Sequence, residues 1–305
     1  MGLNVSALND FNNEVAGELI IRSVYEGQTT SILPVKEGIK HQEPLNLFDV
    51  DLQIQGGTCV STPSGSMIAS QRNISVTPRT SYDGLCLKDL DTKYLGISAL
   101  EPGSYNETFA LANAYGEMLT NQFAKKNDQF LWNTTSGSSA GLGYFTSGSN
   151  SGVVVPSSIT GSAFSSTNAL TVIDTLIDNL DADVADRDDL TVWMSVTNFR
   201  KYVTALRSAN NFYFDPGSIT NRTGILSMAY PFQNVKVVGT TGLQGSDRVV
   251  LMPDAYAVVG TDLLSDLSEF QMWYDINSDQ LKHRISTKLG VQIAYPEYIV
   301  SNDRN

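Results

Sequence analysis

Residues 270–296 read FQMWYDINSDQLKHRISTKLGVQIAYP, and two patterns in this stretch decide the fold. From Leu281 to Tyr295 apolar and polar residues alternate, which is typical of a strand with one buried face. The preceding FQMWYD predicts a shorter strand, and DINSDQ supplies the turn that joins the two. His283 falls in the apolar row, so we interpret it as a strand residue rather than a catalytic one.

The composition indicates a globular protein with an acidic charge balance. The chain has 305 residues, of which 41% are hydrophobic and 17% are charged, and its formal net charge is -12. This acidity argues against a generally basic nucleic-acid-binding surface. The two cysteines, Cys59 and Cys86, are too few for a disulfide framework or a four-cysteine metal site. No apolar run approaches the roughly 20 residues that span a bilayer, so no membrane partner is expected.

A long hairpin is predicted in the first third of the chain. The segments FDVDLQIQGG (48–57) and QRNISVTP (71–78) both alternate, as strands do. Between them, STPSGS contains Pro63 and Gly65, which favour a turn. Neither this hairpin nor the extended arm expected at residues 1–45 can bury its own apolar residues well, so both are expected to find partners on neighbouring copies.

One long helix follows the hairpin. Ser104 and Glu107 form a capping-box pattern, and apolar residues then recur at three- and four-residue steps. These signals predict a helix over residues 104–127 that lies along a larger element.

The second half mixes helices with strands. Residues 168–184 (NALTVIDTLIDNLDADV) predict a helix, and residues 190–195 (LTVWMS) a buried strand. Thr197 is the expected N-cap of a further helix, NFRKYVTALRS. VKVVG and RVVLM predict two short strands, and the aromatic stretch 209–232 is expected to be a long loop.

No catalytic or metal-binding motif in the sequence has the context that it requires. Residues 137–141 match G-x-S-x-G with Ser139 at the nucleophile position, but the match lies in a Ser/Gly-rich loop rather than between a strand and a helix. The acidic run Asp181 to Asp189 lacks the glycine and glutamate spacing of a calcium loop. We therefore expect no catalytic, cofactor-binding or metal-binding residue, and no enzyme.

The order of these elements resembles the major capsid proteins of tailed bacteriophages with the Hong Kong 97-type fold. The stretch of sequence most similar to that family lies at the C-terminal end and reads DAYAVVGTDLLSDLSEFQMWYD followed by LKHRISTKLGVQIAYPEYIVSN. The resemblance covers nearly the whole chain and implies an α+β fold. It implies an N-terminal arm at 1–45, an E-loop hairpin at 46–84, a P-domain formed by 85–154 and 263–305 with a spine helix at 104–127, and an A-domain at 155–262.

The resemblance also implies a function and partners. Copies of the chain are expected to form pentamers and hexamers that close into an icosahedral shell around double-stranded DNA, without sequence-specific contacts to that DNA. Portal, scaffold or decoration proteins are expected partners, and the virion is the expected location, after assembly in the host cytoplasm.

The tip of the hairpin is where contacts between subunits are expected, because its turn signals indicate exposure. The candidate contact residues are Gly56, Gly57, Pro63, Ser64, Gly65 and Ser66. In the founding member of the family, an E-loop lysine forms an isopeptide link with an asparagine of a neighbour. No lysine occurs between Phe48 and Leu87 here, so noncovalent contacts are expected instead.

Three alternative functions remain open from the sequence. An encapsulin-like nanocompartment shares the implied fold and encloses a cargo enzyme. A serine hydrolase would use Ser139 with His283 and an aspartate. A non-catalytic carbohydrate-binding or fibre protein is compatible with the aromatic stretch 211–230.

Overall fold

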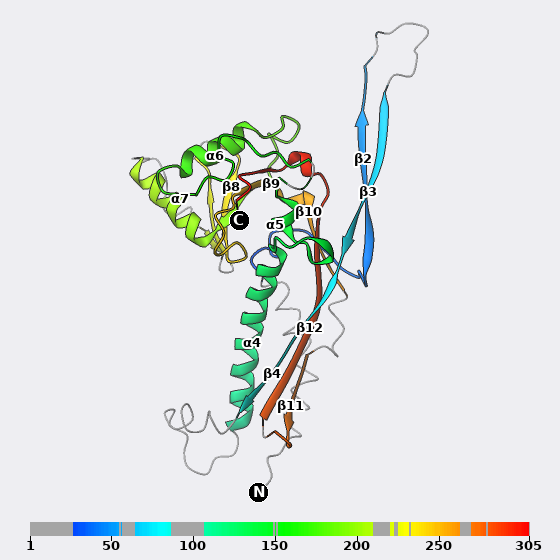
Figure 1. Ribbon diagram of the computed structural model, residues 1–305, viewed down its shortest axis with the longest axis vertical. Helices are drawn as coiled ribbons and strands as arrows, with labels where there is room; N and C mark the ends of the chain where they lie inside the picture. Colours follow the sequence, from blue (N-terminus) through cyan, green and yellow to red (C-terminus); the bar gives the residue numbers. More distant parts are fainter. Residues whose placement is uncertain are drawn as a thin grey trace.

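Strand β12 (Gln280–Ile293) is the central strand of a five-stranded sheet. We call it the longer sheet, because its two longest strands are longer than any strand of the second main sheet. The structure is a computed structural model, which describes residues 27–54, 56, 65–86, 107–148, 150, 152–209, 220–222, 225–231, 233–262, 270–278 and 280–304. Figure 1 shows this sheet in the lower part of the molecule, a second sheet with its helices beside the upper end, and a hairpin that projects away from both.

The longer sheet is built on both edges of β12. Strand β4 (Thr77–Cys86) pairs antiparallel along one edge. On the other edge lie β11 (Phe270–Asp275) and β10 (Ala257–Thr261), and β1 (Val35–Lys36) runs parallel to β10. The predicted pair of closing strands is therefore confirmed.

The alternation along β12 also has the predicted outcome. From His283 to Ile293 the odd-numbered positions are buried, including His283 at 2% exposure and Ile285 at 3%, whereas Arg284 between them is exposed. Burial lowers the pKa of His283, and the nearby Asp83 charge opposes that effect only in part. A histidine in this setting is a core residue of the sheet.

The second sheet has six strands. Its order is β13 (Val300–Ser301), β9 (Val250–Pro253), β5 (Leu190–Ser195), β8 (Lys236–Thr240), β7 (Ile225–Ala229) and β6 (Thr220–Arg222). Strands β5 and β8 are parallel, and the other pairs are antiparallel. Helices α6 (Ala169–Asp178) and α7 (Val196–Ser208) pack together against one face of this sheet (Figure 1).

Strand β5 of the second sheet is buried on both faces. Val192 and Met194 pack in the cluster that contains the two helices, whereas Trp193 packs with residues of β10, β12 and the end of the long helix. An apolar run without alternation is the pattern expected of such a strand. The LTVWMS prediction is thus confirmed, and the two sheets share a core through Trp193.

Several predicted boundaries in this half are corrected. Helix α6 ends at Asp178 rather than 184, because Asp181 accepts the backbone N–H of Asp183 in a turn of its own at 2.9 Å. Helix α7 is capped by Ser195, not Thr197, since the Ser195 hydroxyl accepts the Asn198 N–H at 3.1 Å. Strands β6 and β7 occupy part of the stretch 209–232 that was predicted to be loop.

The hairpin consists of β2 (Gln42–Asp51) and β3 (Ser66–Ser75), paired over all ten positions of each strand. Its strands begin earlier than predicted, and residues 77–84 do not belong to it. The backbone N–H of Val76 bonds to the His41 carbonyl at 2.9 Å, and the chain then continues as β4 onto β12. Pairing with the long strand decides this boundary, which the local alternation could not locate.

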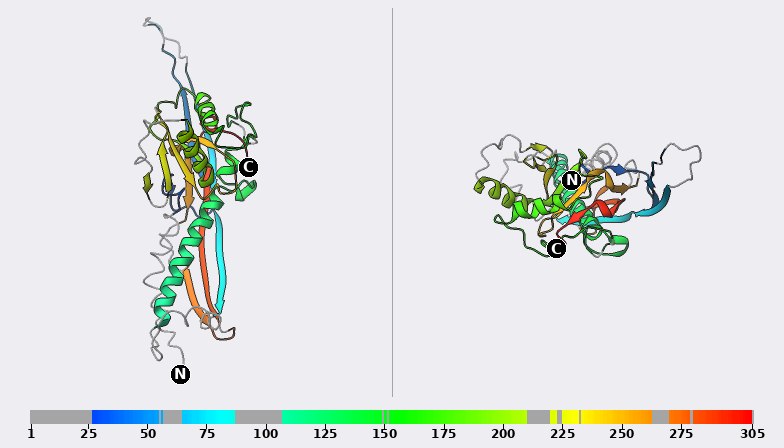
Figure 2. Two further views of the ribbon diagram at one scale, coloured as in Figure 1. Left: turned by 90° about the vertical axis from the view of Figure 1, so that its left-hand side faces the viewer. Right: turned by 90° about the horizontal axis from the view of Figure 1, so that it is seen from above.

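Helix α4 (Glu107–Leu131) lies along β4 and β12 in both side views (Figures 1 and 2). It extends four residues past the predicted end, and the predicted cap at Ser104 lies outside the described residues. Asp128 anchors its last turn by accepting the Thr29 N–H and the Thr240 hydroxyl, both at 2.8 Å. Shorter helical turns are η2 (Gly137–Ser139), α5 (Leu142–Phe145), η4 (Asp254–Tyr256) and η6 (Pro296–Tyr298). No helix in the described ranges is long and apolar enough to cross a membrane.

A buried carboxylate lies where the chain passes from one sheet to the other. Asp254 opens η4, between β9 and β10, and accepts the Thr191 hydroxyl at 2.7 Å and the Trp193 indole N–H at 3.1 Å. Burial raises the pKa of Asp254 to about 7, a larger effect than that of either hydrogen bond. The junction therefore contains a group that titrates near neutral pH.

We predict that Asp254 makes the folded state less stable as the pH rises from 5 to 8. The folded state holds this proton up to about pH 7, whereas an exposed aspartate loses it near 3.8, so stability decreases across that interval. Asp254→Asn is expected to flatten the dependence, because the amide carries no charge, its oxygen accepts the Trp193 N–H, and its nitrogen donates to the Thr191 hydroxyl oxygen. Melting temperatures at pH 5 and pH 8 measure it, and an equal slope in the variant would contradict the prediction.

Candidate intersubunit surfaces

The distal half of the hairpin carries apolar side chains that nothing in the described chain covers. Phe48 and Val50 are 58% and 59% exposed, and Met67, opposite Val50, is 66% exposed. Residues directly opposite in an antiparallel pair share a face, so these three form one apolar row. Leu52 and Ile54 continue the every-second-residue spacing past β2, at 80% and 94% exposure. We call Phe48, Val50, Leu52, Ile54 and Met67 the apolar row.

The apolar row is unusual for a hairpin that stands away from its protein. Figure 1 shows the outer ends of β2 and β3 extending beyond both sheets. Exposed strands normally carry charges or prolines that discourage pairing and aggregation. A contiguous apolar surface on a protruding element is instead typical of a protein–protein contact.

The predicted contact residues fall around this segment. Gly56, Gly65 and Ser66 are exposed, and Ser66 pairs with Asp51 at the last rung of the hairpin. Gly57, Pro63 and Ser64 lie outside the described residues. The sequence pattern pointed to the tip but missed the apolar row, although the alternation in FDVDLQI was its signal.

The root of the hairpin is held against β12. The Gln292 amide donates to the Asn73 carbonyl at 2.8 Å, and the Tyr295 hydroxyl donates to the Phe48 carbonyl at 3.3 Å. Ile39, Ile74 and Val76 form a small buried cluster there, each at most 3% exposed. These contacts set the direction in which the apolar row projects.

Two glycines lie where the root of the hairpin passes over β12 and β10. Gly290 of β12 and Gly260 of β10 are opposite each other in the sheet. A Cβ at Gly290 would lie 2.0 Å from the Ser75 carbonyl oxygen, so the hairpin backbone occupies the space of a side chain. The close approach of two backbones therefore requires glycine at this position.

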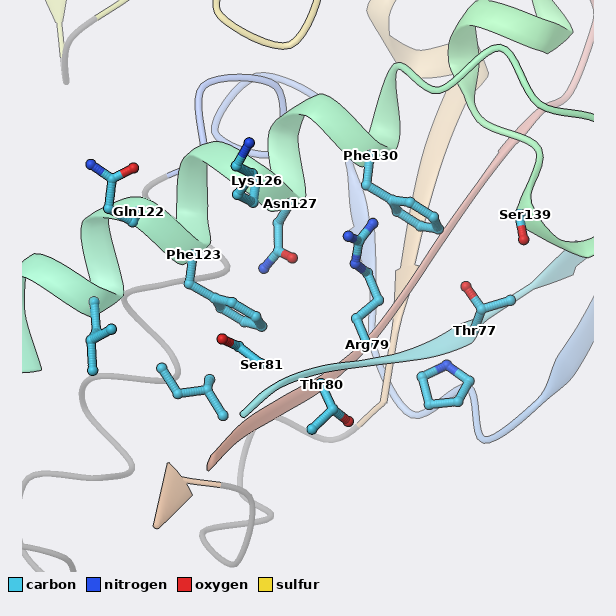
Figure 3. Close-up of a pocket in the computed structure, with 13 residues that line it drawn as sticks. Thr77, Arg79, Thr80, Ser81, Gln122, Phe123, Lys126, Asn127, Phe130 and Ser139 are labelled. Atoms are coloured by element: carbon cyan, nitrogen blue, oxygen red, sulfur yellow. The ribbon is translucent and has the colours of Figure 1, made fainter. Parts of the chain in front are cut away.

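A cavity of about 560 Å³ lies between α4 and β4. Phe123 and Asn127 point into it from α4, and Arg79 rises from β4 toward Phe130 (Figure 3). The Arg79 guanidinium lies 3.8 Å from the centre of the Phe130 ring, within cation–π distance. The lining therefore combines aromatic and cationic groups.

The structure does not place Ser139 and His283 as a serine hydrolase would require. Ser139 lies in η2 at one end of this cavity, preceded by a loop rather than a strand, and His283 is not among the residues that line it. Its own environment keeps His283 inside the sheet, opposite Asp83 and Met272. Within the described ranges, no group of three or more histidine, cysteine or acidic side chains is arranged to hold a metal ion.

Comparison with known proteins gives no match by sequence and many by structure. No family model matches the chain, and no curated protein sequence matches it. The fold is similar to that of a virus-like particle from Pyrococcus furiosus, at 11% identity and a TM-score of 0.53, over 94% of this chain and 97% of that chain.

Two phage particles give similar values. The satellite phage P4 procapsid matches at 11% identity and a TM-score of 0.53, over 95% of this chain and 91% of that chain. The capsid of Myoviridae phage XM1 matches at 14% identity and a TM-score of 0.52, over 88% of each chain. The chain therefore has the α+β fold of capsid subunits, the class to which its sheets, long helix and projecting hairpin correspond. More particularly, it folds like the subunits of phage capsids.

Proposed function

We propose that this chain is the major capsid protein of a tailed phage with the Hong Kong 97-type fold. Copies form pentamers and hexamers that close into an icosahedral shell around double-stranded DNA. The observation that carries the proposal is the apolar row, because a capsid-like fold with an uncovered apolar hairpin needs a neighbouring copy to bury it. The role is structural rather than enzymatic, and the virion is its location.

The elements have a natural division under this proposal. The E-loop is the β2–β3 hairpin with its tip, and α4 with the β4–β12–β11 sheet forms the spine and P-domain. The six-stranded sheet with α6 and α7 is the A-domain, and the residues that precede β2 contribute the arm. Residues around the tip, Gly56, Gly57, Pro63, Ser64, Gly65 and Ser66, add contacts to those of the apolar row.

Partners follow from the same proposal. Portal, scaffold and decoration proteins bind the shell, while the packaged DNA is held by a closed wall rather than by a basic lining. The net charge of -12 fits this arrangement, because any contacts to DNA inside are weak and salt-sensitive.

Electron microscopy of the chain expressed alone tests the proposal, combined with light scattering for particle mass. Closed shells, tubes or rings of five and six subunits are the expected result. A uniform monomer at all protein concentrations, salt concentrations and pH values, also in the presence of its co-expressed scaffold, would contradict it. Shells that enclose a second protein, identified by mass spectrometry, would instead indicate a nanocompartment.

A further inference from the structure

The cavity between α4 and β4 contains polar groups without partners. Asn127 is 4% exposed, and within the described part of the chain neither its amide oxygen nor its amide nitrogen forms a hydrogen bond. One terminal nitrogen of Arg79 is likewise buried without an acceptor. Burying such groups unpaired costs about 1–3 kcal/mol each. These unpaired groups therefore destabilise the isolated chain, and a partner that forms hydrogen bonds with them removes that cost.

The charge of the cavity is positive in an otherwise acidic protein. Arg79 and Lys126 are the charged residues among its described lining, and no carboxylate is present. The chain has 32 acidic and 20 basic residues, yet no described carboxylate pairs with Arg79. A half-buried guanidinium with one terminal nitrogen unpaired and no anion beside it is the kind of group that a ligand carboxylate satisfies.

The unpaired groups specify a peptide rather than a simple anion. A free anion accepts hydrogen bonds only, so it would leave the Asn127 amide oxygen unsatisfied. A peptide group satisfies both ends of that amide, because its carbonyl accepts from the nitrogen and its N–H donates to the oxygen. The aromatic walls, Phe123 and Phe130, accommodate an aliphatic portion of the same segment. The cavity volume, about 560 Å³, lies within the range of about 300–1,000 Å³ typical of ligand sites.

We propose that this cavity binds an acidic peptide segment of a neighbouring copy of the chain. Its carboxylate pairs with Arg79 and its backbone pairs with Asn127, once rotation of the Arg79 side chain opens the floor of the cavity. The inference rests on the proposed function, which packs copies side by side. With a net charge of -12, every copy offers acidic segments to its neighbours.

Two variants and a matched control test the site. Arg79→Gln is expected to raise the protein concentration needed for assembly by roughly tenfold or more, because it removes a charge-assisted contact. Asn127→Leu is expected to raise the melting temperature of the monomer, since it replaces unpaired polar atoms by an apolar group of similar size, while it weakens assembly. Lys125→Gln removes an exposed charge of α4 outside the cavity and is expected to assemble normally.

Photocrosslinking identifies the occupant. A benzophenone amino acid replaces Leu119, which lines the cavity, in particles assembled from equal amounts of nitrogen-14 and nitrogen-15 subunits. Mass spectrometry is expected to find mixed-isotope crosslinks from position 119 to a segment that contains aspartate or glutamate.

The outcomes separate this inference from the proposed function. Shells without such crosslinks, a crosslink to a different protein, or variants that assemble like Lys125→Gln overturn the inference and leave the shell function standing. Failure of the unmodified chain to form any shell or ring overturns both.

Discussion

Serine in place of both Leu52 and Ile54 is expected to leave the monomer folded and to prevent closed shells from forming. These side chains are 80% and 94% exposed, so they contribute little to the stability of an isolated chain. When it is buried against a neighbouring copy, each of these side chains would contribute about 1.5–3 kcal/mol to the association. The loss recurs at every subunit of a shell. Electron microscopy and sedimentation measure assembly, and thermal unfolding measures the monomer.

Gln53→Ser is the matched control for that experiment. Gln53 lies between the two apolar residues and is also exposed, but it is polar and offset from their alternation. It receives the same new side chain in the same segment, and normal shells are expected. If the double variant assembles as well as this control does, the apolar row is not the contact surface and the main support for the proposed function is lost.

Alanine in place of Gly290 is expected to lower the melting temperature and to loosen the hairpin from β12. Its Cβ would lie 2.0 Å from the Ser75 carbonyl oxygen and 3.0 Å from the Val76 Cα, both of which are backbone atoms. Backbone cannot move aside as a side chain does, so the hairpin root must shift, at a cost of about 1–3 kcal/mol or more. Thermal unfolding measures the stability, and hydrogen exchange of β2 and β3 reports on the hairpin.

Gly260→Ala provides the comparison, because Gly260 is the opposite residue of the same sheet. Its Cβ would meet the terminal carbons of Ile74 at 2.8 Å and Ile39 at 3.0 Å, which are ends of flexible side chains. A much smaller loss of stability is expected, with the hairpin still protected from exchange. Equal effects of the two substitutions would show that general crowding, rather than the backbone crossing at Gly290, controls the hairpin.

The candidate surface was only partly predictable from the sequence. The turn residues Pro63 and Gly65 correctly suggested a hairpin, since turn chemistry is local. The exposure of Phe48 and Val50 was not predictable, because alternation is the same whether the apolar face is buried in its own chain or left for another. Asn127 and Arg79 belong to no recognisable sequence motif, and only the packing of α4 on β4 brings them into one cavity.

The sequence by itself determined the type of most elements, including the buried row of β12, the core strand β5 and the long helix α4. Side-chain periodicity is a local property of a strand or helix and can be read without knowledge of its neighbours. The tertiary structure alone decided that β4 pairs with β12 rather than with the hairpin, and that the backbone at Ser75 packs against Gly290, where a side chain would not fit. Strand partners and backbone crossings depend on residues far apart in sequence, where packing rather than local pattern selects the arrangement.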